Sequence, residues 1–158
     1  MVDKKKALSF LILVLPWLTT PLIGKRTFIR FLPVATFIGY GFALFSEVAD
    51  KKKLWKVKNG LFPNYVLDFS YLLGIYFITT IWAFKLAFGN FFKYLTINIV
   101  ADYIFSFHII KFFTKVGVFE FKKMKPKHFF YLSVGSAVFI YFYQLIVERT
   151  IAKEVKKV

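Results

Sequence analysis

The sequence contains no cysteine, two histidines and only eight acidic residues among its 158. The lack of cysteine excludes disulfides, thiolate nucleophiles, iron–sulfur ligation and c-type haem attachment, although it says nothing about the redox compartment. Two histidines, His108 and His128, are too few for a histidine-rich metal site, so we expect neither a metal nor a cofactor. Gly-x-Ser-x-Gly, Walker, His-Glu-x-x-His and dinucleotide-binding motifs are missing as well. These absences favour a protein that is not an enzyme.

Apolar residues, in contrast, are abundant. They make up 58% of the chain and aromatic residues 22%, whereas a soluble domain is about 45–50% apolar. Five apolar runs, separated by lysine-rich breaks, cover residues 7–23, 27–45, 65–84, 91–110 and 129–147. Most approach the ~20 residues that a helix needs to cross ~30 Å of hydrocarbon, where backbone groups must be satisfied within the segment. The sequence therefore predicts an all-α integral membrane bundle, with about five transmembrane helices in a single domain over residues 1–158.

The basic residues lie between the apolar runs. The formal net charge is +15, and all but three of the 23 basic residues are lysine. Arginine is the residue favoured for phosphate recognition, because its planar fork binds oxyanions at two points. We therefore expect no nucleic-acid partner. Basic loops beside membrane spans instead attract anionic lipid, at about 1 kcal/mol per residue.

Two polar connections carry most of these lysines, Ser46–Asn64 and Lys111–Lys127. In the first, lysines interleave with Trp55, which is typical of a segment at the headgroup level. In the second, apolar and polar residues alternate around Phe119 and Phe121, which fits either a short interfacial strand or a frayed amphipathic segment. We expect anionic headgroups to bind at Lys51, Lys52, Lys53, Trp55, Lys56, Lys58, Lys122, Lys123, Lys125 and Lys127.

Orientation follows from the distribution of lysine and arginine over the two sides. With five spans, the N-terminal side holds 14 of the 23 basic residues. This bias predicts a cytoplasmic N-terminus. A first span that re-enters on the same side would divide the basic residues almost evenly and would predict no orientation.

Ionisable and amide groups inside the spans are the candidate site. Such groups are costly in lipid and are a functional-site hypothesis by default. Asn98 and Asp102 are four residues apart and share one helix face, and Asp68 is expected at a similar depth on the preceding span. Tyr71 and His108 complete the predicted intramembrane cluster. The cluster could handle protons or cations, or it could be a hydrogen-bonded clasp between two helices.

Packing predictions concern proline and small residues. Pro16 and Pro21 interrupt the first span, and the turn at Gly24 joins it to the second, so we expect these two spans to form a tight helical hairpin. Small residues allow helices to approach closely in lipid. We predict such contacts at Gly39-x-Gly41, at Gly74 and at Gly135-Ser136-Ala137.

The segments 21–33, 82–85, 89–95 and 98–102 resemble an uncharacterised family of small multi-pass membrane proteins in Bacillus-like, spore-forming bacteria. The similarity covers most of the chain. It implies a multi-pass protein of the bacterial plasma membrane and transfers no catalytic residue. We expect a non-enzymatic accessory or structural component that contacts anionic lipids, with a homo-oligomer or another membrane protein as a further partner. The alternatives are a small proton- or cation-coupled transporter or channel subunit and an intramembrane lipid-modifying enzyme.

Overall fold

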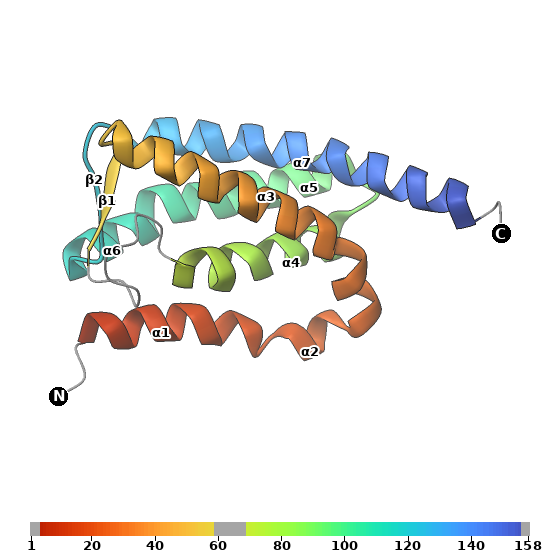
Figure 1. Ribbon diagram of the computed structural model, residues 1–158, viewed down its shortest axis with the longest axis horizontal. Coiled ribbons are helices and arrows are strands. Elements are labelled where there is room, and N and C mark those ends of the chain that lie inside the picture. Colours follow the sequence, from red (N-terminus) through yellow and green to blue (C-terminus); the bar gives the residue numbers. More distant parts are fainter. Residues whose placement is uncertain (1–3, 59–68, 156–158) are drawn as a thin grey trace.

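The computed structural model describes residues 4–58 and 69–155, and the side chains of residues 6–58 and 69–151. The described part is an all-α bundle with one short two-stranded ribbon at its end (Figure 1). The elements in chain order are α1 (Lys4–Trp17), α2 (Thr20–Ile23), α3 (Lys25–Lys51), β1 (Trp55–Val57), η1 (Tyr71–Tyr76), α4 (Phe77–Ala87), α5 (Phe91–Ile104), η2 (Phe105–Ile109), α6 (Ile110–Val116), β2 (Phe119–Phe121) and α7 (Pro126–Val155). The predicted fold class is confirmed.

Four helical segments are long and apolar enough to cross a membrane: Lys6–Ile23, Lys25–Lys51, Phe91–Val116 and Pro126–Ile151. They contain four of the five predicted spans. The other predicted span, 65–84, corresponds to the shorter apolar helix Tyr71–Ala87, and its first four residues lie outside the described part. The protein is therefore a multi-pass membrane protein.

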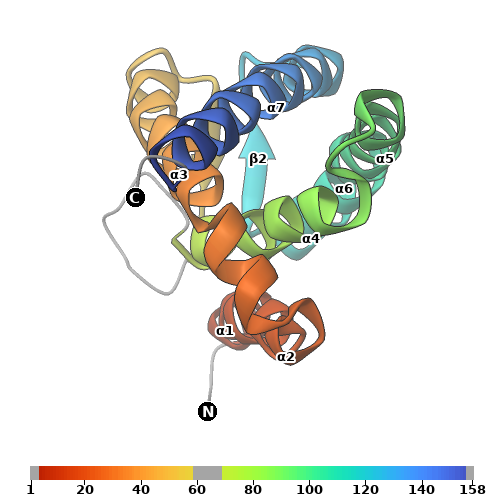
Figure 2. The same cartoon turned by 90° about the vertical axis from the view of Figure 1, so that its right-hand side faces the viewer.

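Helix α4 lies at the centre of the bundle. It packs against α3, α5 and α2, and the π-helical segment η1 that leads into it packs against α1. Figure 2 shows α4 between α1 and α2 on one side and α3 and α7 on the other. The chain does turn at Gly24 between α1 and α3. The prediction of a tight hairpin is nevertheless wrong, because η1 and α4 lie between these two helices.

A chain of aromatic rings joins α3, α4, α5 and α7. Phe31 on α3 lies 5.4 Å from Phe84 on α4, which lies 4.8 Å from Tyr94 on α5. The ring of Tyr94 in turn lies 4.9 Å from that of Tyr141 on α7. All four residues are buried. Offset and tilted aromatic pairs add stabilisation beyond that from the apolar area that they bury. This addition matters in a membrane, because lipid tails solvate apolar side chains and burial alone drives little association between helices.

The ribbon closes one end of the bundle. β1 pairs antiparallel with β2, with Lys56 opposite Glu120, and Lys122 N–H donates to the Leu54 carbonyl at 2.9 Å. Of the two alternatives for the second connection, the structure thus shows the strand. An isolated two-stranded ribbon is marginal, and this one is supported by aromatic side chains that pack beneath it on the bundle end.

Gly74 is the small residue on which the close packing of α1 depends. A Cβ at this position would lie 2.2 Å from the Ile12 carbonyl oxygen, so no other residue fits without moving α1. A Cβ on Gly39 would make only an ordinary contact, and one on Gly41 or Gly135 would meet nothing within 4 Å. The packing prediction is therefore confirmed for Gly74 and for Ala137, which is buried in the core, and it is wrong for Gly41 and Gly135.

We predict that Gly74→Ala lowers the stability of the protein by about 1–3 kcal/mol, the usual cost of overpacking. Gly41→Ala is the matched control and should be neutral or slightly stabilising, because alanine is the better helix former and the site is open. Thermal unfolding in one detergent compares the two variants. Equal stability of both would contradict the packing assigned to Gly74.

Candidate functional site

The ribbon brings the two lysine-rich connections to the same end of the bundle (left in Figure 1). We call residues 51–58 and 119–127 the lysine ribbon. Its lysines are all exposed: Lys51, Lys52, Lys53, Lys56, Lys58, Lys122, Lys123, Lys125 and Lys127. The pairing of β1 with β2 thus concentrates on one surface charges that are more than 60 residues apart in the sequence.

Glu120 is the one carboxylate within the lysine ribbon, and it joins the ribbon's two halves. Its oxygens lie 2.6 Å from Lys58 Nζ and 2.7 Å from Lys122 Nζ. Hydrogen bonds from these lysines lower the pKa of Glu120 from 4.5 to about 2. The ion pairs therefore contribute fully above pH 4.5, and their contribution is lost as the pH falls through about 2.

Trp55 does not occupy the position that the sequence predicts. Its side chain is 4% exposed and lies 5.6 Å from the ring of Phe45 and 6.2 Å from that of Phe129. Alternation along β1 explains the difference, since Trp55 and Val57 face the bundle while Lys56 faces outward. Trp55 thus anchors the ribbon on the bundle, and its ring is not available to headgroups.

A polar stripe runs along the inner side of α5 and η2. Tyr94, Asn98, Asp102 and Ser106 follow one another at intervals of four residues, which places them on one helix face. Tyr94 and Ser106 are fully buried, and the Ser106 hydroxyl makes no hydrogen bond to any described residue. The Asn98 amide donates to the Tyr94 carbonyl at 2.8 Å. Only the middle two members were predicted as site residues, although the spacing of all four is visible in the sequence.

The structure brings together part of the predicted intramembrane cluster. Asp102 is half-buried and lies within electrostatic range of the phenols of Tyr71 and Tyr76, which come from η1. His108 is exposed and its ring lies beside that of Tyr103, so it contributes nothing to this group. Asp68 lies outside the described residues.

A second charged group lies near the opposite end of the bundle. Arg30 on α3 binds Glu148 on α7 at two points, with Nε–Oε1 at 2.6 Å and Nη2–Oε2 at 3.1 Å. Gln144 donates to the same carboxylate at 3.1 Å, and the guanidinium stacks over Phe88. Arg30 was not predicted as a site residue. It is one of three arginines in a lysine-rich chain, and this rarity was the available signal.

Lys85 also serves the fold at that end. Its ammonium donates to the Leu22 carbonyl at the end of α2 and lies 4.8 Å from the centre of the Trp82 ring. Trp82 donates to Thr19 at 2.9 Å. These contacts hold the α2–α3 turn against α4, so Lys85 and Trp82 have structural partners.

No protein-family model, curated protein or solved structure matches this chain. Among the described residues, no group of three or more histidine, aspartate or glutamate side chains could hold a metal ion. The lysine ribbon and the polar stripe of α5 are therefore the two features from which a function can be argued.

We predict that the Arg30–Glu148 pair contributes at least about 1 kcal/mol of coupling energy, because charge-assisted bidentate bonds are roughly twice as strong as neutral ones. A double-mutant cycle of Arg30→Gln and Glu148→Gln, read by thermal unfolding in detergent, measures it. The Lys122–Glu120 pair, which is about equally exposed but is joined by a single hydrogen bond, is the control and should give a smaller coupling energy. Additive effects of the Arg30 and Glu148 substitutions would show that the pair stabilises nothing.

Proposed function

We propose that this protein is a non-enzymatic component of the bacterial plasma membrane that binds anionic lipid headgroups through its lysine ribbon. The carrying observation is the concentration of nine exposed lysines, with one carboxylate among them, on one end of a bundle of membrane helices. Anionic lipids attract such residues by about 1 kcal/mol each near the surface. The chain's basic bias supports an orientation with the ribbon and the N-terminus in the cytoplasm, where anionic lipid is exposed to it.

The shape of the ribbon supports the same function. Because Trp55 and its aromatic neighbours tie β1 and β2 to the bundle, the lysines project from a surface of defined geometry and not from two independent loops. Glu120 engages only Lys58 and Lys122. The other lysines keep their charge available for phosphate groups. Through these lysines the protein would bind anionic lipid or another membrane protein that presents acidic groups, as an accessory component does.

We predict that neutralising four ribbon lysines reduces the enrichment of anionic lipid around the protein in mixed nanodiscs. The variant is Lys52, Lys53, Lys123 and Lys125→Gln, which leaves the two partners of Glu120 intact. The expected loss is up to about 1 kcal/mol per lysine, and added salt should reduce the wild-type enrichment because exposed charges are screened over about 8–10 Å. Mass spectrometry of the co-purified lipid measures the enrichment.

A matched control removes the same charge from the opposite end, where the exposed residues to replace with glutamine are Lys25, Arg26, Lys93 and Arg149. This variant should keep most of the enrichment. Equal losses in the two variants would show that net charge, and not the ribbon, recruits the lipid.

Proton- or cation-coupled transport is the second candidate, and the polar stripe of α5 is the observation that favours it. The buried Ser106 hydroxyl, which has no hydrogen-bond partner among the described residues, and a half-buried carboxylate, Asp102, lie on one face of a membrane helix. Proton uptake by the reconstituted protein that Asp102→Asn abolishes would support transport. Its absence would leave the stripe as a contact between helices.

A further inference from the structure

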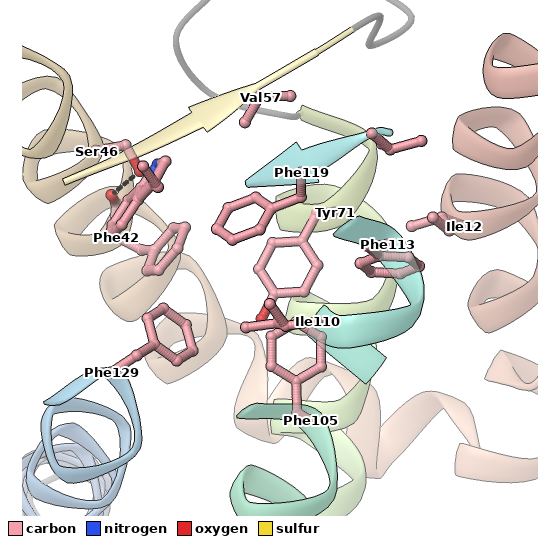
Figure 3. A pocket seen from close by; sticks show the side chains of 12 residues that line it. Ile12, Phe42, Ser46, Val57, Tyr71, Phe105, Ile110, Phe113, Phe119 and Phe129 are labelled. Atoms are coloured by element: carbon pink, nitrogen blue, oxygen red, sulfur yellow. Dashed lines mark hydrogen bonds between the residues drawn. The ribbon is translucent and has the colours of Figure 1, made fainter. Parts of the chain in front are cut away.

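An apolar cavity of about 50 Å³ lies directly beneath the lysine ribbon. Figure 3 shows its lining side chains converging from the ribbon, from α1 and α3, and from the two π-helical segments. Its walls are almost entirely aromatic and aliphatic, with Ile12, Phe42, Tyr71, Phe105, Ile110 and Phe129 among them. π-Helical turns are rare and occur often at functional sites, and here η1 and η2 each place an aromatic ring, Tyr71 and Phe105, against the same space.

The lining offers no charge and little hydrogen-bonding capacity. Ser46 lines the cavity, but its hydroxyl donates to the Phe42 carbonyl at 2.9 Å. Tyr71 is the one titratable residue in the wall. Apolar cavities of this kind do not hold ordered water and bind apolar molecules instead. The ligand chemistry that fits is therefore hydrocarbon.

The position of the cavity indicates that its ligand also carries an anionic group. Trp55, Val57 and Phe119 form its outer wall, and each belongs to a ribbon strand. Lys56 stands between Trp55 and Val57 on the opposite face of β1, and Lys58 follows immediately. An anionic group bound by Lys56 would thus lie one strand thickness from hydrocarbon held below. The site thus has a basic outer surface and an apolar interior, which match the anionic headgroup and the acyl chain of a lipid.

We propose that the cavity holds a segment of one acyl chain of an anionic lipid whose headgroup lies on the lysine ribbon. This inference rests on the proposed function and names the ligand of the same site. The volume limits how much of the chain enters: one water-sized group needs about 10–15 Å³ in such a cavity, so roughly four methylene groups fit. The remainder of the chain stays in the bilayer.

Headgroup charge, and not the cavity, gives the selectivity. An acyl chain that enters the cavity leaves one hydrocarbon environment for another, so transfer supplies little free energy. Filling the space restores the dispersion contacts that the lining atoms lack. The ribbon lysines then discriminate between anionic and zwitterionic lipids that carry the same chain. Occupancy should follow the headgroup and fall with salt.

Trp55 provides a direct probe, because it lines the cavity and is 4% exposed. The test uses a variant with Trp17→Phe and Trp82→Phe, reconstituted with lipids that carry brominated acyl chains, which quench tryptophan at short range. We expect brominated anionic lipid to quench Trp55 several-fold more than brominated zwitterionic lipid at equal mole fraction. In the control variant, which retains only the half-buried Trp82, the two lipids should quench equally.

A cavity-filling substitution, Val118→Phe, should remove the excess quenching while the protein remains folded by size exclusion and helicity. Ser46→Leu is a second filling variant, should the first not fold. Persistence of the excess in a folded filling variant would place the lipid elsewhere and overturn the inference.

Other outcomes separate this inference from the proposed function. Anionic enrichment in nanodiscs without quenching of Trp55 would refute the cavity site and leave headgroup binding intact. Equal quenching by both lipids would refute selection by the lysines. If anionic lipid is not enriched and Trp55 is not quenched, the proposed function and the cavity site are both refuted.

Discussion

Pairing of β1 with β2 is the contact on which the functional surface depends. It joins residues 55–57 to residues 119–121, and with them the two lysine-rich connections. Like charges oppose this approach, so something else must stabilise it. Glu120 offsets part of the repulsion by binding a lysine from each half, and the aromatic side chains under the ribbon exclude water from its inner face. The same strands therefore present charge outward and apolar surface inward.

The bundle supports this ribbon through packing between helices. Hydrophobic burial drives association weakly in lipid, so close contact, aromatic pairing and hydrogen bonds must hold the helices. Gly74 allows α1 to reach η1, the rings of Phe84 and Tyr94 join α4 to α5, and Arg30 ties α3 to Glu148 on α7. The charged pair lies near the end opposite the ribbon. One end is thus closed by an ion pair between two helices of the same chain, while the other leaves its lysines exposed.

Hydropathy alone predicted the helical fold and the location of four spans, because the cost of unsatisfied backbone in lipid leaves few alternatives. The ribbon pairing could not be predicted in the same way. Pairing of two three-residue strands depends on contacts across more than 60 residues, and local alternation could not distinguish a strand from an amphipathic helix end. The inward position of Trp55 follows from that pairing and was missed with it. The full polar stripe was visible in the spacing of Tyr94 and Ser106 around Asn98 and Asp102, whereas the Arg30–Glu148 pair required knowing that α3 and α7 are neighbours.

The central claim is that the lysine ribbon faces the anionic cytoplasmic surface while the Gly24 turn lies on the other side. Since the chain has no cysteine, Lys123→Cys and Lys25→Cys each introduce a single thiol at an exposed position on one of the two ends. A membrane-impermeant maleimide applied to intact cells should label position 25 and should label position 123 only after permeabilisation. Labelling of position 123 from outside, or of both positions from the same side, would contradict the account.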